Sequence, residues 1–275
     1  LLLAVIARVF WVRGREREVR GSLTFARARL TGPVMRAGGL AVLLVVGLGG
    51  FVFYNTNVLN EYRTPHEQQA LLAEYERRYK RYEDAPQPRI TRAELRIELY
   101  PAASAADLRG SFTLLNDQAQ PIDSVHIAHN PEVETRTLEF DRPAQRVLHD
   151  VALDYDIYRL TQPLQPGDSI RLSFDLRVRR RGFRNSGQPT AMVENGAHFA
   201  RLWLPFIGYR AAGELNDADT RAEHGLPPAE AMPSPYDTAA ARRASSAIRG
   251  AEPVLVDAII GTDCTQTAIT VGRLV

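Results

Sequence analysis

A long stretch without any charged residue, Ala37 to Asn60, constrains this chain more than any other feature. Its centre reads GGLAVLLVVGLGGFVFY. A helix needs roughly 20 predominantly apolar residues to cross a bilayer core of ~30 Å, and this stretch is long enough. A buried helix of a soluble protein is the alternative, but such helices seldom run this long without a charge. We therefore predict a transmembrane helix over residues 37–58.

The residues after the apolar centre favour an uncleaved helix over a cleaved signal peptide. A signal peptide needs a small-residue cleavage site after its apolar core, and FYNTNVLNEYR supplies none. Phe51, Phe53 and Tyr54 suit the far membrane interface, where aromatic rings prefer to sit. We expect the helix to remain in the protein as an anchor.

The flanking charges predict the orientation of this helix. Only Glu16 and Glu18 oppose the arginines of the preceding loop, which are Arg13, Arg15, Arg17, Arg20, Arg27, Arg29 and Arg36. Under the positive-inside rule, residues 13–36 form a basic cytoplasmic loop, and residues after about 58 lie in the periplasm or otherwise outside the cytoplasm. Residues 1–12, LLLAVIARVFWV, look like the end of an earlier membrane helix. A nucleic-acid-binding arm is the less favoured interpretation of the loop, because apolar segments flank it on both sides.

The composition excludes several classes of protein. The net charge is only +2, so no overall field favours nucleic acid as a partner. Cys264 is the single cysteine, which rules out an internal disulfide and a cysteine-based zinc site. The chain begins at Leu1 and stops at Val275 within an apolar run, and we expect it to be part of a longer protein.

A helix is predicted within residues 59–88. Thr64, Pro65 and Glu67 form a strong helix start, in which Thr64 caps and Glu67 completes a capping box. One apolar face follows at helical spacing, formed by Leu71, Leu72, Tyr75, Tyr79 and Tyr82. Pro86 and Pro88 end the helix. We expect an amphipathic stalk or packing helix with a solvated charged side, and a coiled-coil dimerisation helix is the alternative.

Residues 89–275 predict a mainly β domain. Apolar and polar residues alternate around Ile97, around Phe174 and around Tyr155, which is typical of strands with one buried and one wet face. In the strand around Tyr155, Asp154 and Asp156 are predicted to lie on the wet face. Further strands are expected near 108–115, 123–129, 134–140, 253–260 and 266–271. The spacing favours an antiparallel sandwich or saddle-shaped sheet. Asp217 and Asp219 are expected to cap a short helix through Ala222.

No catalytic, cofactor-binding or metal-binding residue can be assigned from motifs. The sequence contains six histidines, namely His66, His126, His129, His149, His198 and His224. None lies in H-E-x-x-H, the spacing that places two imidazoles on one helical face beside a glutamate. His126 and His129 should point to opposite faces of a strand. No G-x-S-x-G, P-loop or G-x-G-x-x-G sequence occurs.

Two stretches favour a functional interpretation only weakly. Ala191 to Asn195, AMVEN, is similar to the G-x-M-E-N loop by which aminopeptidases hold a substrate's free amine, but Val193 interrupts it, and we interpret the match as coincidence. The basic run from Arg177 to Arg184 has two interpretations. It is either the charged wet face of a strand end or a contact for anionic lipid head groups or phosphate.

An ordered series of segments carries a family resemblance over nearly the whole chain. The series is FYNTNVLNEYRT, PQPRIT, AELRIELYP, LRGSFTLLNDQAQPIDSVHI, LQPGDSIRLSFDLRV, RGFRNSG, LPFIGY and RAEHGL. It resembles bacterial ABC-exporter permeases fused to an aminopeptidase-N-like (gluzincin metallopeptidase) domain. The resemblance implies the last permease helices followed by the amino-terminal β domain, with the zinc ligands downstream of this region. It therefore implies no cofactor within these residues, and zinc only if the full-length parent is an active peptidase.

The resemblance implies partners and two functions from different classes. The first is a membrane-anchored extracytoplasmic support domain of a metallo-aminopeptidase-like protein fused to an ABC-type permease. The alternative is a non-enzymatic cargo- or partner-binding module of an ABC exporter. Expected partners are the lipid bilayer, other permease helices, a downstream catalytic-type domain and an ABC ATPase subunit, with no nucleic acid. The expected location is the bacterial inner (cytoplasmic) membrane. A weaker third hypothesis, supported only by the Arg177–Arg184 run, is a ligand-binding sandwich on an anchor.

Overall fold

The chain divides into two compact units, a helical unit and a β unit. The computed structural model describes residues 2–10, 30–185, 191–193, 196–198, 203–229, 253–270 and 272–273. The helical unit comprises Leu1–Tyr62 and Arg181–Gln188, and the β unit comprises Arg63–Arg180 and Pro189–Val275. The arginines of the predicted basic loop lie outside the described residues except for Arg36.

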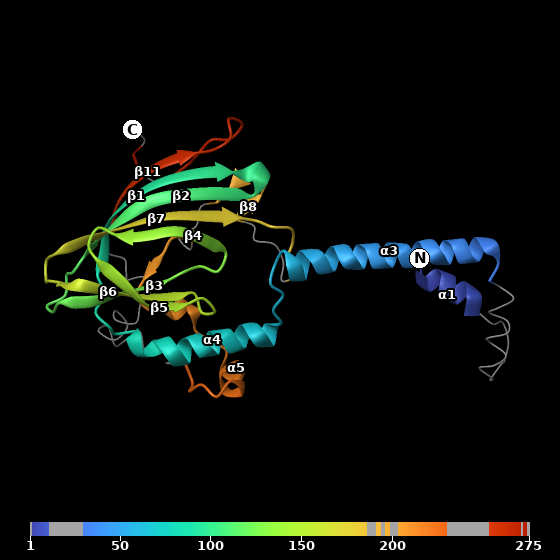
Figure 1. Cartoon of the computed structure of the whole chain (residues 1–275), viewed down its shortest axis with the longest axis horizontal. Coiled ribbons are helices and arrows are strands. Elements are labelled where there is room, and N and C mark those ends of the chain that lie inside the picture. Colours follow the sequence, from blue (N-terminus) through green and yellow to red (C-terminus); the bar gives the residue numbers. More distant parts are fainter. Residues whose placement is uncertain are drawn as a thin grey trace, which may run out of the picture. The chain divides into compact units, whose positions relative to one another are not determined.

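The helical unit consists of α1 (Leu2–Phe10), α3 (Gly32–Phe53) and a π-helical turn, η1 (Tyr54–Val58). In Figure 1, α1 lies beside the amino-terminal half of α3, where Val9 and Ala41 are buried. The apolar helix near the amino terminus is confirmed. By length and composition, Gly32–Val58 is the one helix in the described part of the chain that is able to cross a membrane. It begins before the predicted residue 37, because a proline close to its start suits the first helical turn.

Most apolar side chains of α3 are exposed. The exposed apolar residues follow one another in the chain and therefore lie on every side of the helix. They include Val42, Leu43, Leu44, Val45, Val46, Leu48, Phe51, Val52 and Phe53. A helix that is apolar on every side belongs in a large protein core or in a bilayer.

Polar side chains close the carboxyl end of this helix. Asn55 Nδ2 donates to the Phe51 carbonyl at 2.8 Å, and Thr56 Oγ1 donates to the Val52 carbonyl at 2.9 Å. These bonds supply extra donors to carbonyl groups near a helix end, where backbone partners run out. The helix therefore ends in a polar turn immediately after its apolar residues.

The β unit contains two main sheets and a short hairpin. Its strands are β1 (Arg89–Tyr100), β2 (Ala105–Leu115), β3 (Ile122–Ala128), β4 (Val133–Phe140), β5 (Ala144–Asp150), β6 (Tyr155–Leu164), β7 (Ser169–Arg179), β8 (Met192–Val193), β9 (Gly196–Ala197), β10 (Phe206–Ile207) and β11 (Leu255–Gly261). The first sheet has the order β11-β1-β2-β7-β4, the second has the order β10-β3-β6-β5, and β8 pairs with β9. Figure 1 shows the two main sheets as separate layers, one above the other.

The core lies between the two main sheets and is built by alternation along the strands. In β7, Ile170, Leu172, Phe174 and Leu176 are at most 3% exposed, whereas the residues between them are more exposed. Burying one such side chain stabilises the fold by about 1.5–3 kcal/mol. The rings of Phe112 on β2 and Phe174 on β7 meet edge to face, with centroids 4.9 Å apart. The prediction of a mainly β, sandwich-like domain is confirmed.

The last strand differs from the prediction in its direction and its partner. β11 pairs with β1 in parallel, from Arg92 opposite Leu255 to Glu98 opposite Gly261. Parallel pairing needs a long connection, and most of the chain of the β unit separates these two strands. The predicted strand over 266–271 is wrong for its described residues, 266–270, which form no strand. The chain turns instead at Asp263, whose carboxylate accepts from the Thr265 amide at 3.0 Å.

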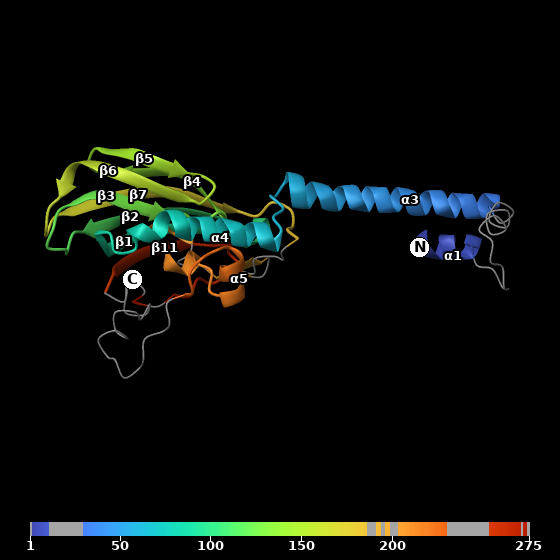
Figure 2. The same cartoon turned by 90° about the horizontal axis from the view of Figure 1, so that it is seen from below.

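The predicted amphipathic helix is α4 (Pro65–Tyr79), followed by the turn η2 (Lys80–Tyr82). Its capping box is confirmed: the Thr64 amide donates to Glu67 at 2.7 Å, and the Glu67 amide donates to Thr64 Oγ1 at 3.2 Å. Tyr79 stacks on Tyr155 of β6, with ring centroids 4.2 Å apart. The apolar face thus packs on the outer side of the second sheet, and Figure 1 shows α4 below β3 and β5, while Figure 2 views the unit from the side of α4.

A short helix, α5, follows the irregular segment after β10. The predicted cap is confirmed, because Asp217 Oδ1 accepts from the Thr220 amide at 2.9 Å at the start of α5 (Ala218–Glu223).

Strand β5 was not predicted. It follows β4 directly but belongs to the other sheet, since β4 pairs with β7 and β5 pairs with β6. The chain therefore changes sheets around Pro143, and this crossing places β4 and β5 on opposite sides of a cavity.

Candidate functional site

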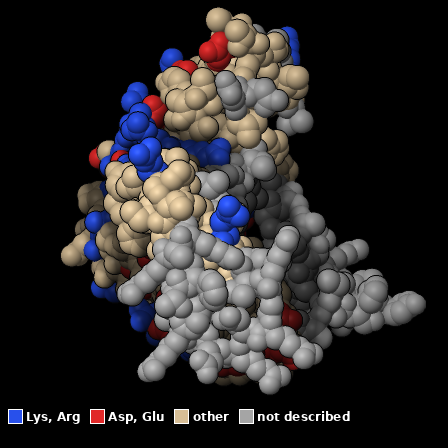
Figure 3. Space-filling model, turned by 90° about the vertical axis from the view of Figure 1, so that its right-hand side faces the viewer, with Lys and Arg blue, Asp and Glu red and all other residues tan. Residues whose placement is uncertain are grey.

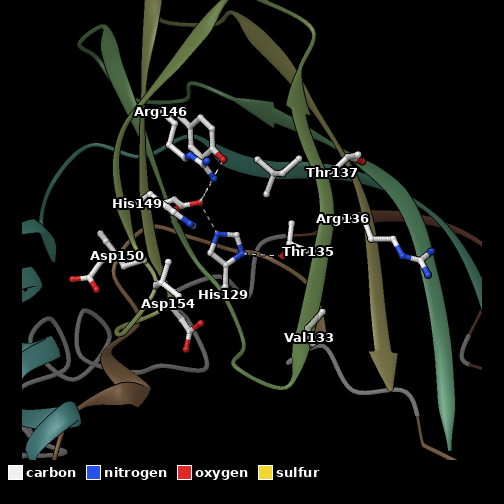
Figure 4. Close-up of a pocket in the computed structure, with 14 residues that line it drawn as sticks. His129, Val133, Thr135, Arg136, Thr137, Arg146, His149, Asp150 and Asp154 are labelled. Carbon is white, nitrogen blue, oxygen red and sulfur yellow. Dashed lines mark hydrogen bonds and ion pairs between the residues drawn. The ribbon is translucent and has the colours of Figure 1, made fainter. Parts of the chain in front are cut away.

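A cavity of about 350 Å³ opens between β4 and the β5–β6 pair. Figure 4 shows β4 on one side, β5 and β6 on the other, and His129 between them. The lining combines titratable groups with the apolar side chains Val133 and Leu138. This cavity is the candidate site.

Asp156 is the centre of the site. It lies in β6 and is only 3% exposed. His149 Nδ1 lies 2.6 Å from Asp156 Oδ1, and His129 Nε2 lies 3.1 Å from Asp156 Oδ2. The Tyr158 hydroxyl donates to Oδ2 at 3.4 Å, and Arg146 Nη1 lies 3.8 Å away. A buried carboxylate therefore contacts two imidazoles and a guanidinium group.

The prediction that Asp156 lies on a wet face is wrong. Both faces of β6 are covered at this point: Tyr155 and Ile157 pack towards α4, and Tyr158 packs into the core between the sheets. The sequence alternation is real, but it separates two buried faces. Asp154, predicted on the same wet face, precedes the strand in a turn with a φ of 52°.

The hydrogen bonds keep Asp156 ionised. Burial alone would raise the pKa of Asp156, but the hydrogen bonds from His129 and His149 outweigh burial and lower the pKa below its usual value. A carboxylate only accepts, so each imidazole donates through the nitrogen that faces it. This places a proton on His149 Nδ1, and the His149 side chain is 49% exposed.

The arrangement can orient one imidazole towards a ligand. Asp156 fixes the ring of His149, as a carboxylate does when it positions a histidine for proton transfer or ligand binding. On the other side, His129 Nδ1 lies 3.4 Å from Thr135 Oγ1 on β4. The site thus links both sheets by hydrogen bonds and presents a half-exposed imidazole to the cavity.

Acidic groups flank the cavity on the α4 side. Asp150 Oδ2 accepts from the Tyr79 hydroxyl at 2.7 Å and from Arg78 Nη1 at 3.3 Å. Burial raises the pKa of Asp154 above its ordinary value. Asp150 therefore connects the rim of the site to α4.

Within the described residues, no group of three or more histidine, cysteine, aspartate or glutamate side chains is arranged to hold a metal ion. His129 and His149 meet at Asp156, and the other four histidines lie elsewhere in the fold. His126 and His129 point to opposite faces, as predicted: His126 Nδ1 lies 3.0 Å from the Tyr155 hydroxyl, and His129 contacts Asp156. The rings of His66 and His224 have centroids 5.2 Å apart and planes inclined by 37°, and His198 follows β9.

The pH dependence of stability should report on His126. Burial lowers the pKa of His126 to about 4, below its ordinary value near 6.5. Between those pH values the unfolded chain binds more protons, so this histidine should reduce the free energy of unfolding by about 3 kcal/mol as the pH falls through that window. Urea unfolding of the wild type and of His126→Gln at pH 4–7 checks this. The free energy of unfolding of the variant should depend less steeply on pH than that of the wild type. Equal slopes in the two proteins would refute the lowered pKa of His126.

The Asp156→Asn variant should lose about 2 kcal/mol of unfolding free energy at pH 7. The substitution replaces charge-assisted hydrogen bonds to His129 and His149 by weaker neutral ones. Because the pKa of Asp156 is lowered, the stabilising contribution is present above the ordinary carboxyl pKa and disappears as the pH falls through the folded-state value. The matched control is Asp168→Asn, a half-exposed side chain 3.9 Å from Arg142, which should change stability far less. Equal losses would contradict the role of the imidazole pair.

The structure describes parts of the two stretches that the sequence favoured weakly as functional, the basic run from Arg177 to Arg184 and the segment from Ala191 to Asn195. Arg177 Nε lies 3.2 Å from Asp107 Oδ1 on the neighbouring strand, so the interpretation as a charged strand face holds there. Arg181 and Arg184 belong instead to the helical unit. Met192 and Val193 form β8, while Glu194 and Asn195 lie outside the described residues.

The residues of the candidate site were missed by sequence reasoning. His149 and Asp156 are direct partners in the β5–β6 register. Predicting a β-hairpin with its turn between His149 and Asp156 would have paired these two residues. The residues of β5 do not alternate clearly between apolar and polar, so this strand was not predicted.

No protein-family model matches the chain, and no curated protein matches its sequence. Partial structural matches fall on M1 zinc metallopeptidases from Deinococcus radiodurans. One covers 34% of this chain and 21% of that chain at 12% identity, with a TM-score of 0.28. A mutant bound to a Tyr-Ser-Ala substrate covers 43% of this chain and 29% of that chain at 14% identity, with a TM-score of 0.30. The chain therefore spans less than a third of the length of these structures.

Proposed function

We propose that this chain is the membrane-anchored extracytoplasmic support domain of a metallo-aminopeptidase-like protein fused to an ABC-type permease. In this proposal α1 and α3 are permease helices in a bacterial inner membrane, and the β unit lies in the periplasm. The catalytic zinc ligands belong to a downstream domain. The β unit contributes a rigid surface rather than catalytic groups.

The observation that carries the proposal is the apolar helix Gly32–Val58 joined to a separate β domain. The apolar side chains of the helix are exposed on all sides, it ends in a polar turn, and the chain continues into a β domain with its own core. The order of these parts matches the order of the segments that resemble permease–aminopeptidase fusions. Such a helix without a bilayer or neighbouring helices would leave a large apolar surface in water.

The test compares residues 1–275 with the full-length parent in detergent. The parent should bind zinc and cleave an aminoacyl substrate, whereas residues 1–275 should do neither, because their described part supplies no cluster of metal ligands. Equal activity per mole in residues 1–275 would overturn the proposal. The reading frame beyond Val275 should encode H-E-x-x-H followed by a glutamate on the next helix.

The cavity at Asp156 favours a second candidate, a non-enzymatic cargo- or partner-binding module of an ABC exporter. A half-exposed His149 beside a fixed carboxylate is a usable hydrogen-bonding site for a peptide or small polar cargo. Under this alternative, His149→Ala should reduce export, while the exposed control His66→Ala should not. Export that is unchanged in His149→Ala and after deletion of residues 90–275 would exclude it.

A further inference from the structure

The segment from Arg181 to Asn185 is tied to the polar end of the apolar helix. Asn60 Nδ2 donates to the carbonyl of Arg181 at 2.7 Å and to that of Phe183 at 3.3 Å. The same amide group bonds the Asn55 carbonyl at 2.9 Å, and its oxygen accepts from Arg184 Nε at 3.2 Å. All these groups belong to the helical unit. One asparagine thus fixes a segment more than a hundred residues away to the helix end.

Gly182 shows that this attachment is close-packed. Its φ of 58° is in the left-handed region that favours glycine, and an added Cβ would collide with the side-chain oxygen of Asn55. The same Cβ would lie 3.2 Å from Leu59 Cδ1. The backbone therefore lies directly against the helix end.

The attachment brings Phe183 beside the apolar part of the helix. Its ring centroid lies 5.7 Å from that of Phe51, with the ring planes inclined by 51°. Phe51 is 59% exposed and belongs to the uncharged stretch. Asn55 lies one helical turn later, roughly 6 Å along the axis. Phe183 therefore lies at the depth where the apolar helix gives way to polar groups.

Arg181 and Arg184 flank this ring on an exposed surface. A guanidinium group binds phosphate oxygens through paired hydrogen bonds and keeps its charge at every physiological pH. An aromatic ring at the apolar boundary with cations beside it is the composition found at membrane interfaces. On the face drawn in Figure 3, Lys and Arg side chains form blue patches next to uncharged areas.

We propose that Arg181, Phe183 and Arg184 form a second membrane contact, in which Phe183 inserts at the interface beside Phe51 and the two arginines bind lipid headgroup phosphates. The inference rests on the proposed function in one respect, namely that α3 crosses a bilayer. It assigns the basic run two roles, since Arg177 pairs with Asp107 within the sheet while Arg181 and Arg184 face lipid. Each arginine near an anionic membrane surface favours the bound state about five-fold.

Spin labels on the full chain in phosphatidylcholine–phosphatidylglycerol vesicles test the insertion. In a Cys264→Ser background, single cysteines replace Phe51, Phe183 or Tyr100, and the collision rates of the labels with oxygen and with a water-soluble nickel complex give their depth. Labels at 51 and 183 should be shielded from nickel, while the label at Tyr100, an exposed residue of the β unit, should be accessible. If the label at position 51 is shielded from nickel but the label at position 183 is accessible, this inference alone is overturned. If the label at position 51 is itself accessible to nickel, the membrane helix is overturned and the proposed function with it.

The arginines are tested with the label at position 183. The Arg181→Gln/Arg184→Gln variant should shift the equilibrium of the label towards water about 25-fold, the product of two five-fold terms. The matched control Arg177→Gln/Arg179→Gln removes the same charge from the strand and should leave the label shielded. An equal shift in both variants, or none in either, would overturn headgroup binding by Arg181 and Arg184.

Discussion

Replacing Arg221 with methionine should lower the free energy of unfolding of the β unit by about 3–5 kcal/mol. Arg221 and Glu76 are each 2% exposed, and their side chains form two parallel contacts of 2.8 and 2.7 Å between α5 and α4. Arg221 Nε also donates to the Pro227 carbonyl at 2.8 Å. The substitution leaves the buried Glu76 carboxylate without its close counter-ion, because Lys80 Nζ lies 3.9 Å from Oε1, and this loss costs far more than the pair contributes. Urea unfolding in detergent, followed by the fluorescence of buried Trp203, measures the change.

Two variants decide whether the buried pair is responsible. The double variant Glu76→Leu/Arg221→Met should recover most of the loss, because neither charge then remains buried. Arg78→Met removes an exposed partner of Glu74 and should cost less than about 1 kcal/mol. A single Arg221→Met variant as stable as Arg78→Met, or a double variant as unstable as the single one, would contradict this account.

Placing arginine at both Leu44 and Val45 should abolish stable membrane insertion of the helix. These residues lie near the middle of Gly32–Val58, where each arginine costs about 2.5–3.5 kcal/mol, so that the pair costs about 5–7 kcal/mol. The wild-type chain should remain in the membrane pellet after alkaline carbonate washing, and the variant should be released or degraded.

The control places the same charges on exposed apolar residues of the β unit. Val147 and Val151 are 43% and 71% exposed, and arginine at both should leave the chain in the pellet. If the Leu44→Arg/Val45→Arg chain also stayed in the pellet, with its β unit folded, the helix would not be the membrane anchor.

Features with local signals could be predicted from the sequence. The apolar helix follows from an uncharged run, and the start of α4 follows from Thr64 and Glu67, whose side chains bond across three residues. The turn at Gly167 follows from its neighbours Pro166 and Asp168, since its φ of 84° suits glycine. In each case the residues that decide the structure are close together in the chain.

Features that depend on distant partners could not be predicted. Nothing near Glu76 indicates that Arg221 will bury it, because the pair is 145 residues apart. The Asp156 side chain meets His129, which lies 27 residues away in the chain, and His149 on the neighbouring strand. The candidate site was missed for the same reason: its imidazoles come from the end of β3 and from the unpredicted β5.

The central claim is that the β unit lies outside the cytoplasm on a membrane helix, and reporter fusions after Val275 test it most directly. Alkaline phosphatase needs disulfides that form outside the cytoplasm, whereas green fluorescent protein exported in unfolded form stays dark. Our account predicts an active phosphatase fusion and a dark fluorescent-protein fusion in a bacterial host. A stably expressed but inactive phosphatase fusion, together with a bright fluorescent-protein fusion at the same residue, would contradict it.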